Sequence, residues 1–140
     1  MKNTLISIAT ILVCASCSST KTANDNVSLN GEWNIVEINS VSVDTSKTET
    51  APFLVFDTKK NSLYGCVGCN SINGTTHIDA DKQTLSFPQI GITLMLCAKM
   101  DTEKSVLAAL EKVKGYKEVG EKRVALTDEG GKAVLTLQQK

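Results

Sequence analysis

The residues best suited to chemistry in this sequence are its cysteines. Cys66 and Cys69 lie within a glycine-rich stretch, and Cys97 follows some distance downstream. Two more, Cys14 and Cys17, lie close to the amino terminus. Cysteines can pair as a disulfide, exchange thiols or bind a metal, so the surrounding sequence has to indicate which of these uses applies.

The first residues have the order of a secretory signal peptide. Lys2 precedes an apolar run that is shorter than the about 20 residues of a membrane-spanning helix, and small residues precede Cys17. This order resembles the bacterial lipobox, whose cysteine is acylated and becomes the new N terminus. We expect a signal peptide over residues 1–16, a lipid on Cys17 and a polar, flexible tether over residues 17–28. The alternative is an ordinary signal peptide with a coincidental cysteine.

Export places the remaining cysteines in an oxidising compartment, which favours a structural disulfide. A Cys69–Cys97 bond would close a loop of about 29 residues and stabilise the fold by roughly 3–4 kcal/mol, whereas a Cys66–Cys69 bond would give roughly half as much. From the residues alone, Cys66–Cys97 stays open as well. A redox Cys-x-x-Cys pair is disfavoured because a strand pattern follows it and no βαβ unit surrounds it. A zinc site with His77 as a ligand is disfavoured because no second cysteine pair is present and exported thiols tend to oxidise.

Composition and the other polar residues indicate no catalytic machinery. The chain of 140 residues predicts one domain, and its 15 basic and 15 acidic residues balance without a basic run that would bind nucleic acid. The acidic residues lie at predicted turns, and no nucleophile or phosphate-binding motif is present. We expect no enzyme activity, cofactor or metal. We also expect His77 to lie on a strand and Asn70 to occupy a turn with a left-handed backbone.

Alternating apolar and polar residues predict short strands over most of the chain. Pro88 is expected to end one of them, and residues 90–97 to be extended but irregular. The segment 39–51 is polar and is expected to be a loop. The strands are expected at residues 29–39, 53–56, 62–66, 75–79, 84–87, 116–119, 123–127 and 132–137.

One segment has the period of a helix instead. Val106, Leu107, Leu110 and Val113 form an apolar stripe, which predicts a helix over about residues 102–114 with Asp101 as its cap. A single helix with one apolar stripe has to pack against another element, and we expect it at the open end of the curved sheet. The sequence thus predicts a mainly β (α+β) domain whose sheet curls or closes.

Three motifs resemble those of one known family. They are Leu29-x-Gly31-x-Trp33, the centre Gly68-Cys69-Asn70, and the downstream Thr93-x-Met95-x-Cys97. Together they make residues 29–140 similar to the META domain family, which includes bacterial lipoproteins. Two positions depart from the family pattern. Leu94 stands where the family usually has an arginine, and Cys66 is an additional cysteine.

The resemblance implies an antiparallel, lipocalin-like barrel or half-barrel of about eight strands with one helix near residues 102–114. Together with the loop lengths, it favours a Cys69–Cys97 disulfide and leaves Cys66 single. It implies no reaction, because no catalytic activity is established for the family.

The resulting hypothesis is a non-enzymatic envelope lipoprotein, anchored at the outer membrane, with a stress-related structural or interaction role. Its expected partners are the membrane, through the lipid on Cys17, and an envelope protein. The alternative is a module that binds a lipid or another small hydrophobic ligand inside the barrel. A cavity inside the barrel would favour the alternative; an interior filled by side chains would disfavour it.

Overall fold

The computed structural model describes residues 27–140. The predicted signal peptide (residues 1–16), the predicted lipid site at Cys17 and most of the predicted tether lie outside the described residues. No helix in the described part of the chain is long and apolar enough to cross a membrane.

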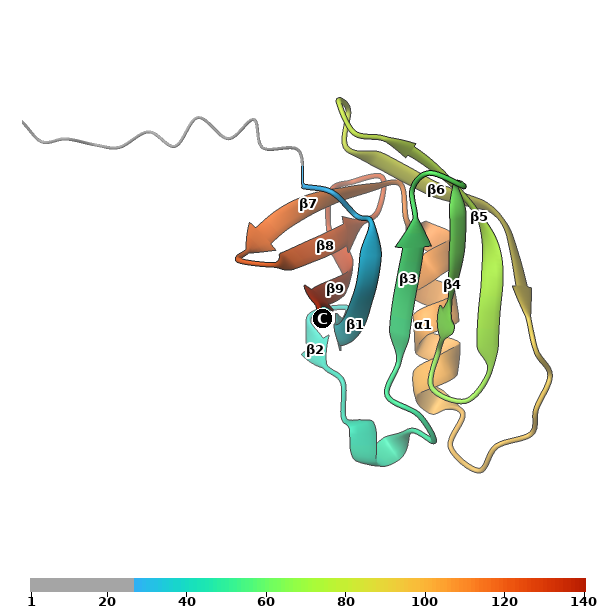
Figure 1. Ribbon diagram of the computed structural model, residues 1–140. Coiled ribbons are helices and arrows are strands. Elements are labelled where there is room, and N and C mark those ends of the chain that lie inside the picture. The colour runs from blue at the N-terminus through green and yellow to red at the C-terminus, as the bar shows by residue number, and fades with distance from the viewer. Residues whose placement is uncertain (1–26) are drawn as a thin grey trace, which may run out of the picture.

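The described residues form one mostly antiparallel sheet in a ring-like arrangement with a single α-helix (Figure 1). The sheet has nine strands in the order β2-β1-β3-β4-β5-β6-β7-β8-β9, and an additional pairing of β1 with β9 brings its two ends together. β6 and β7 pair only at Thr84 and Gly115, so the ring is weakest there. The strands are β1 (Gly31–Ile38), β2 (Val41–Ser42), β3 (Phe53–Asp57), β4 (Ser62–Cys66), β5 (Ser71–Asp79), β6 (Thr84–Ile92), β7 (Gly115–Gly120), β8 (Arg123–Thr127) and β9 (Ala133–Gln139).

The predicted strands are all present, and the count exceeds the expected eight because of β2. The segment 39–51, expected to be a loop, contains both β2 and a short 3-10 helix, η1 (Thr45–Lys47). Asn39 and Ser40 have positive φ angles of 49° and 66°, which turn the chain back from β1 into β2. The carboxylate of Asp44 then accepts a hydrogen bond from the backbone N–H of Ser46 and caps η1. These local polar interactions build structure that apolar periodicity does not reveal.

The interior of the ring is filled by side chains. Trp33 and Ile35 alternate along β1 toward the core, and the indole N–H of Trp33 donates to the carbonyl of Leu29 at 2.8 Å. The large side chains of the interior, such as Phe56, are buried, with Phe87 only partly so. The core cluster includes Trp33, Ile35, Leu54, Phe56, Leu63, Ile72, Leu85, Val106, Leu110, Tyr116, Leu126 and Leu135.

Two glycines let neighbouring strands approach each other closely. A Cβ atom at Gly65 would overlap the carbonyl oxygen of Phe53 on β3, and a Cβ atom at Gly74 would overlap that of Gln89 on β6. Neighbouring backbones therefore approach at these positions more closely than any other residue permits. Such glycines are a general device for curving a sheet into a ring.

Pro88 does not end its strand, contrary to the expectation. β6 runs from Thr84 to Ile92, with Ser86 opposite His77 and Gln89 opposite Thr75. The register shifts between these pairs, so Phe87 and Pro88 together lie opposite the single residue Thr76. This is a β-bulge, where one residue forms no ladder hydrogen bond and the missing N–H of proline is tolerated.

The helix α1 (Asp101–Lys112) begins one residue earlier than predicted, and Asp101 is not its cap. Met100 occupies the N-cap position without a side-chain hydrogen bond, and its carbonyl already accepts from the N–H of Lys104. α1 connects β6 to β7 and contacts β1 and β9, and its buried apolar side chains belong to the core cluster. It lies behind β3 and β4 in the view of Figure 1. The expectation that the helix packs against the curved sheet is therefore confirmed.

Candidate functional site

A disulfide joins Cys69 to Cys97, as predicted. Cys69 lies two residues before β5, and Cys97 lies in the chain that leaves β6 and leads to α1. Because β5 and β6 pair antiparallel, the start of one strand meets the end of the other, and the two Cα atoms lie 6.3 Å apart. The bond ties the loop between β6 and α1 to the sheet.

Cys66 carries a free thiol and is buried at the end of β4. Its sulfur lies 4.0 Å from the carbonyl oxygen of Cys69. Because the sulfur of Cys69 is bound to Cys97, Cys66 and Cys69 form neither a dithiol nor a pair of zinc ligands. His77 lies on β5, exposed and opposite Ser86, and residues 27–140 contain no cluster of three metal-binding side chains.

Asn70 is the centre of a buried hydrogen-bond network. Its side-chain oxygen Oδ1 accepts from the backbone N–H of Met95 at 2.7 Å and from the hydroxyl of Thr93 at 2.8 Å. Its Nδ2 donates to the carbonyl of Met95 at 3.2 Å. Met95 lies beyond the end of β6, so no neighbouring strand pairs with its backbone. The side chain of Asn70 takes the place of such a strand.

The interpretation of Asn70 as a turn residue with a left-handed backbone is wrong. Asn70 is absent from the described residues with positive φ, and the nearby residue in that region is Gly68, with φ 124°. The Gly68 carbonyl accepts two hydrogen bonds of 3.0 Å, from the N–H groups of Glu49 and Thr50. Gly68 therefore supplies the turn, and Asn70 supplies the polar contacts.

Glu103 completes the network from α1. Its side chain is 3% exposed, and its carboxylate accepts hydrogen bonds from the backbone N–H of Asn70 at 2.7 Å and from Asn70 Nδ2 at 2.9 Å. A carboxylate is buried without great cost only when it is hydrogen bonded in this way. The sequence reasoning gave Glu103 no such role. The available signal was its place three residues before Val106, on the apolar stripe of the helix.

The residues of the central and downstream motifs therefore serve mainly to hold the fold together. Gly68, Cys69, Asn70, Thr93, Met95 and Cys97 converge on one end of the domain, where every polar side chain among them is bonded within the protein. We call this the distal end. It also contains η1 and the start of α1, and it lies at the bottom of Figure 1.

The chain between β6 and α1 is exposed at the distal end. We call residues 93–100 the distal loop. Leu94 and Leu96 are 91% and 101% exposed, whereas Met95 between them is held by Asn70. The ammonium group of Lys99 donates to the carbonyl of Ser46 at 2.8 Å and ties the loop to η1. The position where the family usually has an arginine therefore presents an apolar side chain to solvent.

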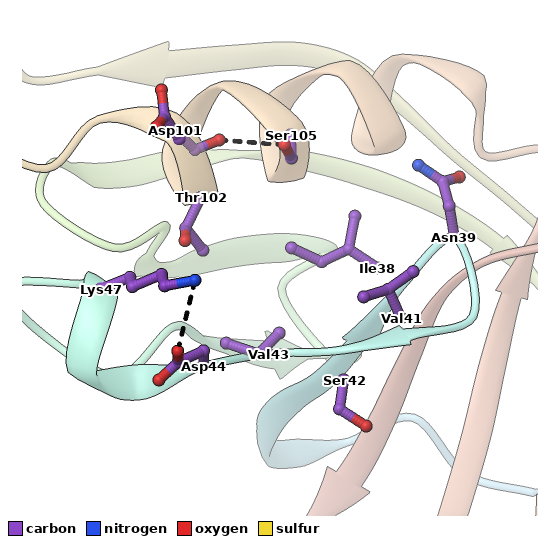
Figure 2. A pocket seen from close by; sticks show the side chains of 10 residues that line it. All are labelled: Ile38, Asn39, Val41, Ser42, Val43, Asp44, Lys47, Asp101, Thr102 and Ser105. Atoms are coloured by element: carbon purple, nitrogen blue, oxygen red, sulfur yellow. Dashed lines mark hydrogen bonds and ion pairs between the residues drawn. The ribbon is translucent and has the colours of Figure 1, made fainter.

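A pocket of about 380 Å³ lies beside the distal loop, between the β2–η1 segment and the start of α1 (Figure 2). Ile38, Val41 and Val43 give it an apolar side, and Asp101, Thr102 and Ser105 of the helix form the other side. Lys47 lies at its edge with the Nζ atom 3.6 Å from Asp44 Oδ2. Hydrogen bonds from Ser46 lower the pKa of the exposed Asp44 carboxyl. The pocket is within the size range of ligand sites, about 300–1,000 Å³.

The fold and the site define a class of small, ring-like antiparallel β domain whose single helix is fixed by a buried Asn–Glu network and a disulfide. The chain belongs to the META domain family, whose model matches residues 25–140. No curated protein is found to match it.

Several solved structures share the fold. An NMR structure of a protein from Burkholderia xenovorans superposes with a TM-score of 0.60 at 22% identity, covering 80% of this chain and 83% of that one. A crystal structure of a DUF4847 family protein from Bacteroides vulgatus gives a TM-score of 0.54 at 14% identity, covering 80% and 94%. At these identities the likeness concerns the fold alone.

Proposed function

We propose that the protein is a non-enzymatic lipoprotein of the cell envelope, anchored at the outer membrane through Cys17, whose distal end binds an envelope partner. The observation that carries the proposal is that the motif residues bond to one another inside the protein. The sulfurs of Cys69 and Cys97 are bonded to each other, and the side chains of Asn70 and Glu103 are hydrogen bonded in the interior. These groups support a rigid surface and are not presented to a substrate.

The position of Val27, the first residue that the structure describes, supports an anchor at the opposite end. Val27 lines a pocket with Ile78 and Ala80, at the end of β5 that is far from Ser71 and the distal loop. A lipid on Cys17 would therefore hold the domain by one end and turn its distal end toward the partner.

A ligand inside the ring is the rival function, and the packing weighs against it. Trp33, Phe56 and Leu135 are fully buried in one core cluster of the described residues. A ligand in the interior would have to displace these side chains. Any ligand would be better accommodated by the surface pocket of Figure 2.

Intact-mass measurement of the membrane-extracted protein tests the proposal. We expect a chain that begins at Cys17 and carries acyl groups, with one cysteine alkylated in denaturant before reduction and three after it. Cys17→Ser should abolish acylation and release the protein from the membrane, whereas Cys14→Ser should change neither. An unmodified N terminus at Cys17 would refute the anchor.

The proposed stress-related role is tested in cells. A strain that lacks the protein should survive heat or antibiotic treatment less well than its parent. Restoring the chain should rescue survival, and restoring the Cys17→Ser variant should not. Equal rescue by the parent chain and by the Cys17→Ser variant would show that the stress-related role does not need the lipid anchor.

A further inference from the structure

The distal loop combines full exposure with a fixed backbone. Leu94 and Leu96 project almost entirely into solvent, and they are two residues apart. The backbone between them is fixed because Met95 is hydrogen bonded at both its N–H and its carbonyl by Asn70. Thr93 is fixed in turn by its N–H to the Ser71 carbonyl at 3.0 Å. An exposed apolar segment that is held rigid loses little entropy when a partner binds it.

The loop faces away from the proposed anchor. It joins the sheet beside Ser71, whereas Val27 lies near Ile78, and β5 spans about 26 Å between these ends. The chain from Cys17 to Val27 reaches at most about 35 Å. A flexible segment of this length spans about 17 Å on average, so the anchoring membrane would contact Leu94 only with the segment stretched well beyond that length along the domain. A protein partner is therefore favoured over a lipid surface.

The size of the loop also disfavours a second copy of the chain. Two leucines and a half-exposed methionine offer far less than the roughly 800 Å² per partner that a stable interface of standard size buries. A small convex segment binds well only in a concave site that surrounds it. Adjacent pockets about 7 Å apart would take two side chains at positions i and i+2 of an extended segment.

We propose that the distal loop occupies the substrate cleft of an endopeptidase that accepts leucine, and blocks it. The inference rests on the proposed function for the direction in which the loop faces. An endopeptidase cleft binds extended segments through side-chain pockets. Residues 93–97 form no helix, turn or bend, and Leu94 and Leu96 offer two exposed apolar side chains at positions i and i+2.

The contacts of the loop explain why it would block the cleft and would not be cleaved and released. Hydrolysis of the Leu94–Met95 bond would add water, with a hydroxyl on the Leu94 carbonyl carbon and a proton on the Met95 nitrogen. Asn70 holds that nitrogen, and Thr93 holds the other new end close to it. The Cys69–Cys97 disulfide keeps the downstream part in place as well. Ends that cannot separate favour resynthesis of the bond over release.

The test uses the full-length protein in detergent and four purified endopeptidases. Chymotrypsin, subtilisin and thermolysin accept leucine near the cleaved bond, and trypsin serves as a control. Residual activity on a small chromogenic substrate measures inhibition, and mass spectrometry measures cleavage of the loop. We expect saturable inhibition of at least one of the first three enzymes, and slower cleavage than of a free peptide of residues 90–99.

Two variants probe the loop itself. Leu94→Asp and Leu96→Asp should each weaken inhibition about tenfold or more without unfolding the protein, because both side chains are exposed. Val119→Asp changes an exposed apolar residue on β7 and should leave inhibition unchanged.

Three outcomes would overturn the inference. The first is no inhibition at a 100-fold excess of the protein over the endopeptidase. The second is cleavage of the loop as fast as of the free peptide, and the third is inhibition by the Leu94→Asp variant equal to that by the parent. If the parent shows no inhibition, and Leu94→Asp added to the unacylated Cys17→Ser chain removes binding to phosphatidylethanolamine–phosphatidylglycerol vesicles, the loop would instead be assigned to a membrane. The intact-mass result is independent of all these outcomes, so failure here leaves the proposed anchor standing.

Discussion

The carboxylate of Glu103 and the backbone N–H of Asn70 form a buried hydrogen bond of 2.7 Å that joins the helix to the glycine-rich turn. A second bond of 2.9 Å, from Asn70 Nδ2, makes the contact bidentate. Asn70 also holds Met95, so one residue connects α1, β5 and the distal loop. The position of the exposed loop thus depends on a buried pair 33 residues apart in sequence.

Removal of the carboxylate tests this connection. Glu103→Ala should lower the free energy of unfolding by about 3 kcal/mol, because it leaves two buried donors of Asn70 without acceptors. Urea denaturation measures the change. Glu111→Ala, an exposed position on the same helix, is the matched control and should stay within about 0.5 kcal/mol of the parent. Equal effects of both would mean that the network contributes nothing.

Reduction of the disulfide should cost about 3–4 kcal/mol on the chain-entropy model, because the Cys69–Cys97 bond closes a loop with a sequence separation of 28. The double variant Cys69→Ala/Cys97→Ala should show the same loss and no further response to reductant. Cys66→Ala should respond to reductant as the parent does, because Cys66 is free. A reductant response in the double variant would contradict the assignment.

Gly74 is predicted to tolerate no side chain. Gly74→Ala should destabilise the protein by about 2 kcal/mol or more, because the new Cβ would overlap the carbonyl oxygen of Gln89 and push two strands apart. Thermal denaturation measures the loss. Gly130→Ala is the control, since its Cβ would lie at an ordinary 3.5 Å from Asp128 Oδ1. A Gly74→Ala variant as stable as the control would show that the two strands can move apart at this position without loss of stability.

Thr76 offers a stabilising change. Its hydroxyl is fully buried opposite the bulge of β6 and has no hydrogen-bond partner among the described residues. Thr76→Val keeps the shape and removes the unpaired group, so the free energy of unfolding should rise by about 1 kcal/mol. The exposed neighbour Thr75→Val is the control and should change stability little. A loss of stability in Thr76→Val would indicate a partner such as a bound water.

Tyr116 should make the free energy of unfolding fall at alkaline pH. Burial, helped by the nearby carboxylate of Asp79, raises the pKa of its phenol above the ordinary 10.0. The folded state then holds the proton more tightly than the unfolded state, so this contribution is complete below pH 10 and is lost as the pH rises further. Tyr116→Phe should flatten the decline of stability above pH 10 in urea titrations. The exposed Tyr64→Phe should leave the decline as in the parent.

The sequence predicted the elements whose evidence is local. The period-two pattern around Trp33 and Ile35 gave β1, and the stripe of Val106 and Leu110 gave α1. Such patterns can be recognised in the sequence because the residues on the buried face recur about every 3.6 residues in a helix and every two residues in a strand. The same reasoning was wrong at Pro88 and Asp101, since a bulge depends on the partner strand and a helix start on its first hydrogen bond.

The sequence by itself determined the kind of fold and, with the family motifs, which cysteines pair. Only the tertiary structure decided what the motif residues do. Asn70 and Glu103 meet because the first turn of α1 lies against the glycine-rich turn before β5, and Leu94 is exposed because Asn70 holds Met95. The physical reason is that hydrogen bonds and exposure depend on contacts between distant segments, whereas local patterns record only which face each residue buries.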